Sequence, residues 1–150
     1  MSDALTTLLE QAESQRNIAL AAFGHARARR DEARAQAREL EAYRDDYTAR
    51  WNGQFQRGGA ALEVVRSYHQ FAGRLELAIT QQVHALTICE QALARANDVL
   101  AAHELRVASV RKLIERRAHE ARATLAQREQ RASDELRVAV ARNPFAGTQL

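Results

Sequence analysis

Apolar residues recur at every seventh position along most of this chain, in two rows separated by a short glycine-containing segment. The first row consists of Leu5, Ala12, Ala19, Ala26, Ala33, Leu40 and Tyr47. The second row consists of Val65, Ala72, Ile79, Leu86, Leu93, Leu100, Val107, Ile114 and Ala121. Apolar residues at heptad spacing form a narrow stripe along a helix, and helices pack against each other along such stripes. The pattern predicts an all-α fold, a long two-helix antiparallel coiled-coil hairpin.

The segment between the two rows contains three of the six glycines of the chain and is expected to form the bend. We predict a single hairpin over residues 1–142, with the first helix at about 3–51, the bend at 52–59 and the second helix at about 60–142. Residues 143–150 are expected to be a disordered tail, because a residue that precedes proline disfavours the helical conformation.

The second predicted helix is much longer than the first. A bend near Phe55 would place residue 5 beside residue 106, so the chain after about Val107 would have no partner helix. This overhanging C-terminal helix is about 35 residues long, or roughly 50 Å at 1.5 Å per residue. Residues 107–142 carry nine arginines and lysines against five acidic residues, so the basic excess of the chain lies in the overhang. An unpartnered amphipathic helix of this length suggests a surface that awaits a partner.

Three arginines interrupt the apolar stripe of the first helix at intervals of fourteen residues, namely Arg16, Arg30 and Arg44. A buried arginine is costly unless its stem packs and its charge reaches water or a carboxylate. We therefore expect these side chains at the rim of the helix pair. The alanines of the same stripe bury little area, so this arm of the hairpin is expected to be only marginally stable.

The sequence contains no recognisable arrangement of residues for catalysis or metal binding. The five histidines are not spaced four residues apart, and the glycines at 58–59 lack the lysine and the preceding strand of a phosphate-binding loop. The lone Cys89 has no partner for an internal disulfide and is interpreted as a small packed side chain. We expect no enzymatic activity, no cofactor and no metal.

The sequence also argues against a nucleic-acid or membrane partner. Acidic residues are interleaved with the arginines of 107–142, and this segment has no aromatic residue on which a base could stack. No stretch approaches the roughly 18 apolar residues of a membrane span, and the first residues lack the basic-then-apolar pattern of a signal peptide. We therefore expect a cytoplasmic protein that acts by binding other proteins.

Two stripes of partly aromatic residues flank the bend with the same spacing of 4, 3 and 4. They consist of Gln36, Leu40, Tyr43 and Tyr47 before the bend, and of Phe71, Leu75, Ala78 and Gln82 after it. In the heptad register both stripes occupy g and d positions, and g positions flank each other across an antiparallel pair. We expect the stripes to form one patch on one side of the hairpin. Such a patch is either a docking site or a broad core that locks the bend.

The residues around the bend resemble those of the FliJ family of bacterial flagellar export proteins. The resemblance lies in Tyr43-x-x-x-Tyr47, a polar glycine-bearing bend, and Tyr68-His-Gln-Phe71-x-x-x-Leu75-Glu76-x-Ala78-Ile79-x-Gln81-Gln82. It implies a stalk-like component of the flagellar type III export apparatus that binds the hexameric ring of the export ATPase FliI and the membrane export gate protein FlhA. It also implies a role in escorting export chaperones, and a place at the inner membrane of the flagellar base.

The resemblance implies two binding sites, and we expect the free protein to be a monomer. The export-gate site maps onto Gln36, Leu40, Tyr43, Tyr47, Phe71, Leu75, Ala78 and Gln82. The last of these positions is often histidine in the family. The helix ends, which the resemblance implies bind the ATPase ring, comprise Leu5, Leu9, Val107, Val110, Arg111, Ile114 and Arg117.

Four other functions are alternatives to the flagellar export protein. The first is the equivalent coiled-coil stalk of a virulence-type secretion system, which the sequence separates from the flagellar protein only through the residues near the bend. The second is a purely structural coiled coil, such as a parallel dimer without a bend. A nucleic-acid-binding helix would show an affinity that falls steeply with salt. An enzyme is disfavoured because a two-helix protein lacks a concave pocket.

Overall fold

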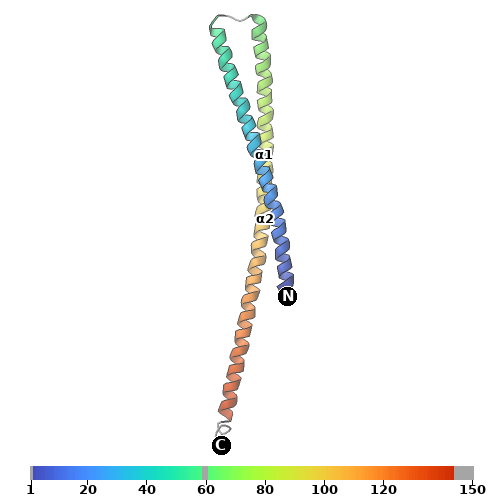
Figure 1. Cartoon of the computed structure of the whole chain (residues 1–150), viewed down its shortest axis with the longest axis vertical. Coiled ribbons are helices and arrows are strands. Elements are labelled where there is room, and N and C mark those ends of the chain that lie inside the picture. The colour runs from blue at the N-terminus through green and yellow to red at the C-terminus, as the bar shows by residue number, and fades with distance from the viewer. Residues whose placement is uncertain (1, 59–60, 144–150) are drawn as a thin grey trace. The chain divides into compact units, whose positions relative to one another are not determined.

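The computed structural model describes residues 2–58 and 61–143 of the chain, which form two helices (Figure 1). Helix α1 spans Ser2–Gln56 and helix α2 spans Leu62–Arg142. The described residues contain no strand, which confirms the predicted all-α class. These residues fall into two compact units, one that joins residues 2–13 with 105–143 and one that comprises residues 14–104. Each helix contributes to both units.

Within the unit of residues 14–104, polar side chains connect the two helices in a regular order. Arg34 contacts Glu90 at 3.8 Å, and the Arg44 guanidinium lies 3.5 Å from the carboxylate of Glu76. Residues further along α1 therefore contact residues that come earlier in α2, which means that the helices run in opposite directions in this unit.

The core of this unit is built from small residues on one helix and larger ones on the other. Its buried residues are Ala19, Ala33 and Ala37 of α1 and Leu75, Ile79 and Leu100 of α2. Alanine allows two helix backbones to approach closely, and each leucine or isoleucine can then fill the space between them. Because alanine buries little apolar area, the fully buried side chains of α1 contribute less hydrophobic stabilisation than those of α2.

The unit of residues 2–13 and 105–143 has its own buried residues, Ala12, Val107 and Val110. Val107 is only 2% exposed, and Arg111 forms an ion pair of 3.0 Å with Glu13. The expectation that contacts between the helices end at about Val107 is therefore wrong. Paired contacts continue along α2 as far as Ile114, which is half-buried.

The contacts extend further along α2 than expected because the first helix ends later than expected. We expected the helix to end at about Trp51, but α1 continues to Gln56 and includes Gly53. One glycine inside a helix costs only about 1 kcal/mol relative to alanine. The rings of Trp51 and Phe55 pack against each other at 5.5 Å, and Phe55 packs against Tyr68 of α2 at 5.5 Å. Aromatic pairs contribute about 0.5–1.5 kcal/mol each, which offsets the cost of the glycine.

The bend itself follows directly after α1. Gly58 has a φ of +141°, a backbone conformation that residues with a side chain rarely adopt. The first turn of α2 closes on the carbonyl oxygen of Ala61, which accepts hydrogen bonds from the amides of Val64 and Val65. Helix α2 begins at Leu62, two residues later than expected. Residue 59 of the predicted bend and residue 60, the expected start of the second helix, lie outside the described residues, as does most of the predicted tail, residues 144–150.

The three arginines in the stripe of α1 lie at the rim of the helix pair, as expected. Each is half-buried, and each donates a hydrogen bond to the residue that follows it in the chain. The pairs are Arg16 with Asn17, Arg30 with Asp31 and Arg44 with Asp45. The hydrogen bond to Asp45 raises the pKa of Arg44 above its ordinary value, and the charges of Asp45 and Glu76 add to this effect.

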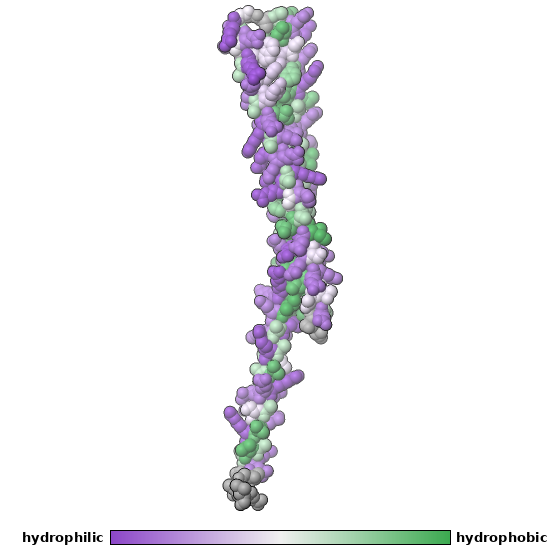
Figure 2. Space-filling view, viewed as in Figure 1, coloured by the Kyte–Doolittle hydropathy of each residue, from purple (hydrophilic) through white to green (hydrophobic). Residues whose placement is uncertain are grey.

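The part of α2 beyond Ile114 differs from the rest of the molecule. Every described residue of 115–143 is exposed, including the large apolar side chains of Leu125, Leu136 and Val140. Figure 2 shows apolar side chains at the surface of this part of α2. The apolar row read from the sequence is therefore covered up to Ile114 and uncovered at Ala121. Neither described helix is long and apolar enough in any stretch to cross a membrane.

Candidate protein-binding surfaces

The structure brings the two stripes near the bend together in the unit of residues 14–104. The Gln82 side-chain amide donates hydrogen bonds to Oε1 of Gln36 at 3.0 Å and to the carbonyl oxygen of Ala33 at 3.2 Å. The ring of Phe71 lies 4.7 Å from that of Tyr47 and 6.4 Å from that of Tyr43, measured between ring centroids. The two helices thus form one surface. We call it the gate patch, after the export-gate site predicted from the sequence. It consists of the eight residues Gln36, Leu40, Tyr43, Tyr47, Phe71, Leu75, Ala78 and Gln82.

The gate patch has an exposed part and a packed part. Tyr43 is 52% exposed, Phe71 is 37% exposed, and Gln36 is also exposed. Leu75 is buried, and the remaining members are half-buried. A partner could therefore contact Gln36, Tyr43 and Phe71 directly, whereas Leu75 supports the surface from below. An aromatic surface of this kind, partly desolvated and rigidly held, is typical of residues that dominate binding energy.

A shallow hollow opens beside the exposed part of the gate patch. It has a volume of about 460 Å³ and is lined by Gln36, Glu39, Leu40, Tyr43 and Gln82. Sequence reasoning missed Glu39, although the residue stands three positions after Gln36 and four before Tyr43 and therefore lies on the same face of α1. The carboxylate of Glu39 gives this hollow an acidic rim.

A second group of rings lies closer to the bend. Tyr47 stacks on Tyr68 at 5.5 Å and contacts Trp51 at 6.2 Å, and Trp51 contacts Tyr68 at 5.8 Å. These rings connect the end of α1 to the beginning of α2, next to the bend. The sequence left two interpretations open, a docking patch or a core that locks the bend. Tyr47 belongs to the group that locks the bend, whereas Tyr43 and Phe71 are exposed, and the docking interpretation stays a prediction.

The residues expected at the helix ends all lie in the other unit, that of residues 2–13 and 105–143. Val107 and Val110 are buried, and Leu5, Leu9 and Ile114 are half-buried. Arg111 is exposed and pairs with Glu13, and Arg117 is exposed. We call these seven residues the end set. Since most of its apolar members are packed within the chain, its accessible part consists chiefly of arginines.

The family model of the flagellar FliJ protein matches residues 1–144 of the chain. The chain belongs to the FliJ family. This confirms the resemblance seen in the residues around the bend. No curated protein and no solved structure gives a significant match to the chain. As a FliJ family member, the protein is a component of the flagellar export machinery, and its family is one of structural export components rather than of enzymes.

The described residues of this FliJ family member contain no group of three or more histidine, cysteine or acidic side chains that could hold a metal ion. Cys89 is half-buried with a free thiol. The described surface carries aromatic rings, side-chain amides and ion pairs. Such groups suit the recognition of other proteins.

Proposed function

We propose that this FliJ family member is a non-enzymatic, stalk-like protein that binds the hexameric ring of the export ATPase FliI and couples it to the membrane export gate protein FlhA. In this proposal the protein also takes part in chaperone escort, is a monomer when free, and works in the cytoplasm at the inner membrane of the flagellar base. The observation that carries the proposal is the family match, supported by two candidate surfaces that share no residue.

The proposed architecture is an antiparallel coiled-coil hairpin with an overhanging α2. Three observations support it: the heptad rows, the reversed order of the contacts in residues 14–104, and the uniform exposure of the described residues 115–143. Contacts between two helices of one chain argue against a parallel dimer without a bend. The flagellar family model favours the flagellar apparatus over a virulence-type secretion system.

For the gate patch, we propose that Tyr43 and Phe71 are the main contacts to FlhA. Both rings are exposed and lie against each other across the two helices. Truncation of an exposed aromatic anchor at an interface typically costs 2 kcal/mol or more of binding energy, about a thirty-fold loss of affinity. The experiment is a binding titration of the purified cytoplasmic domain of FlhA with the Phe71→Ala variant.

The matched control for Phe71→Ala is Leu77→Ala. Leu77 is a large exposed apolar residue of α2, six positions from Phe71 and outside the gate patch. We expect Leu77→Ala to bind FlhA as the unmodified chain does. Equal affinities of Phe71→Ala and Leu77→Ala would count against the assignment of the gate patch.

For the ATPase ring, we propose that the end set and the exposed part of α2 beyond Ile114 form the contact surface. The test is a chain that stops after Ile114, which retains every buried residue of the described structure. A chain that stopped at Val107 would also remove the buried Val110 and the Arg111–Glu13 ion pair, so a loss of binding would be ambiguous. We expect the 1–114 chain to lose FliI binding and to keep FlhA binding. Unchanged FliI binding would refute the role of Arg117 and of the rest of α2 beyond Ile114.

A further inference from the structure

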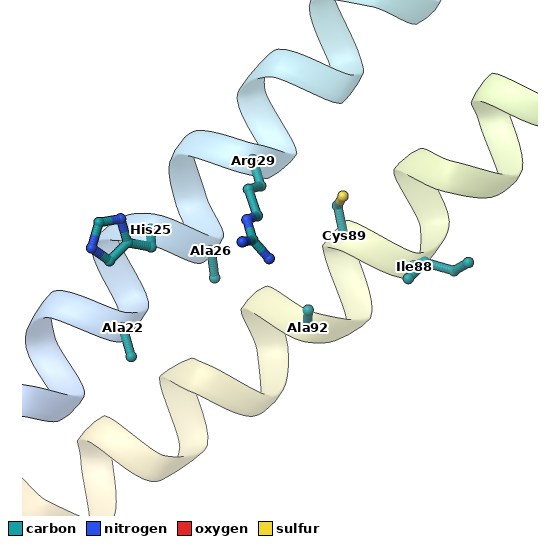
Figure 3. A pocket seen from close by; sticks show the side chains of 7 residues that line it. All are labelled: Ala22, His25, Ala26, Arg29, Ile88, Cys89 and Ala92. Atoms are coloured by element: carbon teal, nitrogen blue, oxygen red, sulfur yellow. The ribbon is translucent and has the colours of Figure 1, made fainter.

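A second hollow lies between the two helices within residues 14–104, away from the gate patch. Its volume is about 420 Å³, and the residues that line it are Ala22, His25, Ala26, Arg29, Ile88, Cys89 and Ala92. Figure 3 shows Ala26 and Ala92 on the facing sides of the two helices, with the Arg29 side chain reaching from α1 toward α2. The floor of this hollow, which we call the alanine hollow, is thus made of methyl groups.

The alanine hollow occupies the same side of the helix pair as the gate patch. A step of fourteen residues, or two heptads, leads from Ala22, Ala26 and Arg29 to Gln36, Leu40 and Tyr43 on α1. The same step in the opposite direction leads from Cys89 and Ala92 to Leu75 and Ala78 on α2. Heptad positions repeat on the same face of a packed helix, so the two surfaces are equivalent positions about 21 Å apart along the helices.

The two surfaces differ in size and charge. Where the gate patch has Leu40 and Tyr43, the alanine hollow has Ala26 and Arg29, so its floor is made of a smaller apolar side chain and its edge carries a positive charge. Ile88 borders the hollow and is 50% exposed. An open apolar floor between two helices, with an exposed apolar side chain at its edge, has the form of a groove into which a third helix packs.

The charge at the alanine hollow is positive and unbalanced. Its neighbours on α1, Arg30 and Arg34, are paired with Asp31 and Glu90. Arg29 has no ion-pair or hydrogen-bond partner among the described residues, and no acidic residue lines the hollow. Arg29 is exposed, and a carboxylate on a partner helix would complement its charge while apolar side chains pack on the floor.

We propose that the alanine hollow is a second docking site, which takes an acidic amphipathic helix of a partner protein. Apolar side chains of that helix pack on Ala22, Ala26 and Ala92, and one of its carboxylates pairs with Arg29. This goes beyond the proposed function, because none of these residues belongs to the gate patch or the end set. The unpaired charge of Arg29 then selects the partner, and the alanines set how closely the helix approaches.

The lone cysteine of the chain offers a direct probe, because Cys89 lines the alanine hollow. The probe ligand is a synthetic, helix-stabilised peptide of about five turns, with leucines at every third or fourth position and glutamates beside them. We expect this peptide to slow the alkylation of Cys89 by iodoacetamide about five-fold or more at saturation. A peptide with lysine in place of each glutamate is expected to leave the rate unchanged.

The variant that tests the charge is Arg29→Glu, and its matched control is Arg27→Glu, which makes the same charge change at an exposed arginine of α1 outside the hollow. We expect Arg29→Glu to weaken binding of the acidic peptide about ten-fold or more, and Arg27→Glu to change it less than about two-fold. Circular dichroism verifies that both variants remain helical. The proposal is overturned if the acidic peptide does not protect Cys89, if the lysine peptide protects it equally, or if both variants bind alike.

Failure of this proposal and failure of the gate assignment are distinguishable. In the Phe71→Ala variant, the acidic peptide is expected to protect Cys89 from alkylation as it does in the unmodified chain, because Phe71 does not line the alanine hollow. Loss of peptide binding in Phe71→Ala would mean that the peptide occupies the gate patch and would overturn the second site. Conversely, FlhA binding that is unchanged in Phe71→Ala would leave the peptide result intact.

Discussion

At the scale of single residues, Gly58 is the position where the backbone demands glycine. Its φ of +141° lies in a region that costs a residue with a side chain about 1–3 kcal/mol. A methyl group placed on Gly58 would meet no other atom within 4 Å, so the cost comes from the backbone alone. We expect Gly58→Ala to lower the free energy of unfolding by about 1–3 kcal/mol, measured by urea denaturation.

The control for Gly58→Ala is the same substitution at Gly24. Gly24 lies inside α1, is exposed, and also has no atom within 4 Å of an added methyl group. Because alanine favours the helix, Gly24→Ala is expected to raise the free energy of unfolding by about 0.5–1 kcal/mol. If the free energy of unfolding changed in the same direction in both variants, this interpretation of the bend would be contradicted.

Two tyrosines one helical turn apart are expected to have different tasks. Tyr47 is half-buried and contacts the rings of Tyr43, Trp51, Tyr68 and Phe71, whereas Tyr43 is 52% exposed. Complete removal of a buried aromatic side chain costs about 3–5 kcal/mol, and a half-buried one proportionately less. We expect Tyr47→Ala to destabilise the chain by about 2–3 kcal/mol and Tyr43→Ala by less than about 1 kcal/mol, measured by urea denaturation. Equal losses of unfolding free energy in the two variants would show that substitutions in the gate patch cannot test binding without also destabilising the fold.

At the scale of the helices, the heptad rows were enough to predict two long helices and the faces that they bury. They also predicted which side chains share the gate patch, because the g and d positions on both helices follow from the register alone. The position of the bend could not be read in the same way. Gly53 suggested a break after Trp51, but the ring contacts among Trp51, Phe55 and Tyr68 keep residues 52–56 helical.

That error in the bend explains the error in the overhang. Because α1 is longer than expected, each residue of α1 contacts a later residue of α2, and Val107 and Val110 are covered. The alanine hollow was missed for a different reason. Ala22, Ala26 and Ala92 look like ordinary packed alanines in the sequence. Only the structure shows that they line a hollow and that Arg29 has no ion-pair partner among the described residues.

The two parts of α2 are expected to differ in stability. Residues 75–110 include the buried side chains of Leu75, Ile79, Leu100, Val107 and Val110, whereas all described residues of 115–143 are exposed. Isolated helices are marginal in water, since most helical stability in proteins comes from packing. We expect backbone amides of 115–142 to exchange hydrogen for deuterium at least about a hundred-fold faster than those of 75–110 in the free protein. Equal protection would mean that a second chain or an unrecognised contact covers this part of α2.

At the scale of the whole molecule, the described residues divide into two units, and each candidate surface draws on one of them. The gate patch lies entirely within residues 14–104, and the end set lies within residues 2–13 and 105–143. The surfaces also differ in chemistry, because the gate patch presents aromatic rings and amides and the accessible end set presents arginines. Partners that recognise these two chemistries need not compete for the same residues.

Simultaneous binding is therefore expected. The full chain, the cytoplasmic domain of FlhA and FliI should form one complex, and saturating FliI should change the affinity for FlhA by less than about two-fold, measured by fluorescence anisotropy of labelled FlhA. Tyr43→Ala should remove FlhA from the complex and leave FliI, whereas the chain that stops after Ile114 should lose FliI and keep FlhA. Displacement of FlhA by FliI would show that the two proteins contact common residues. In that case the protein could not couple the FliI ring to the FlhA gate by binding both at the same time. It would have to dissociate from one before it binds the other.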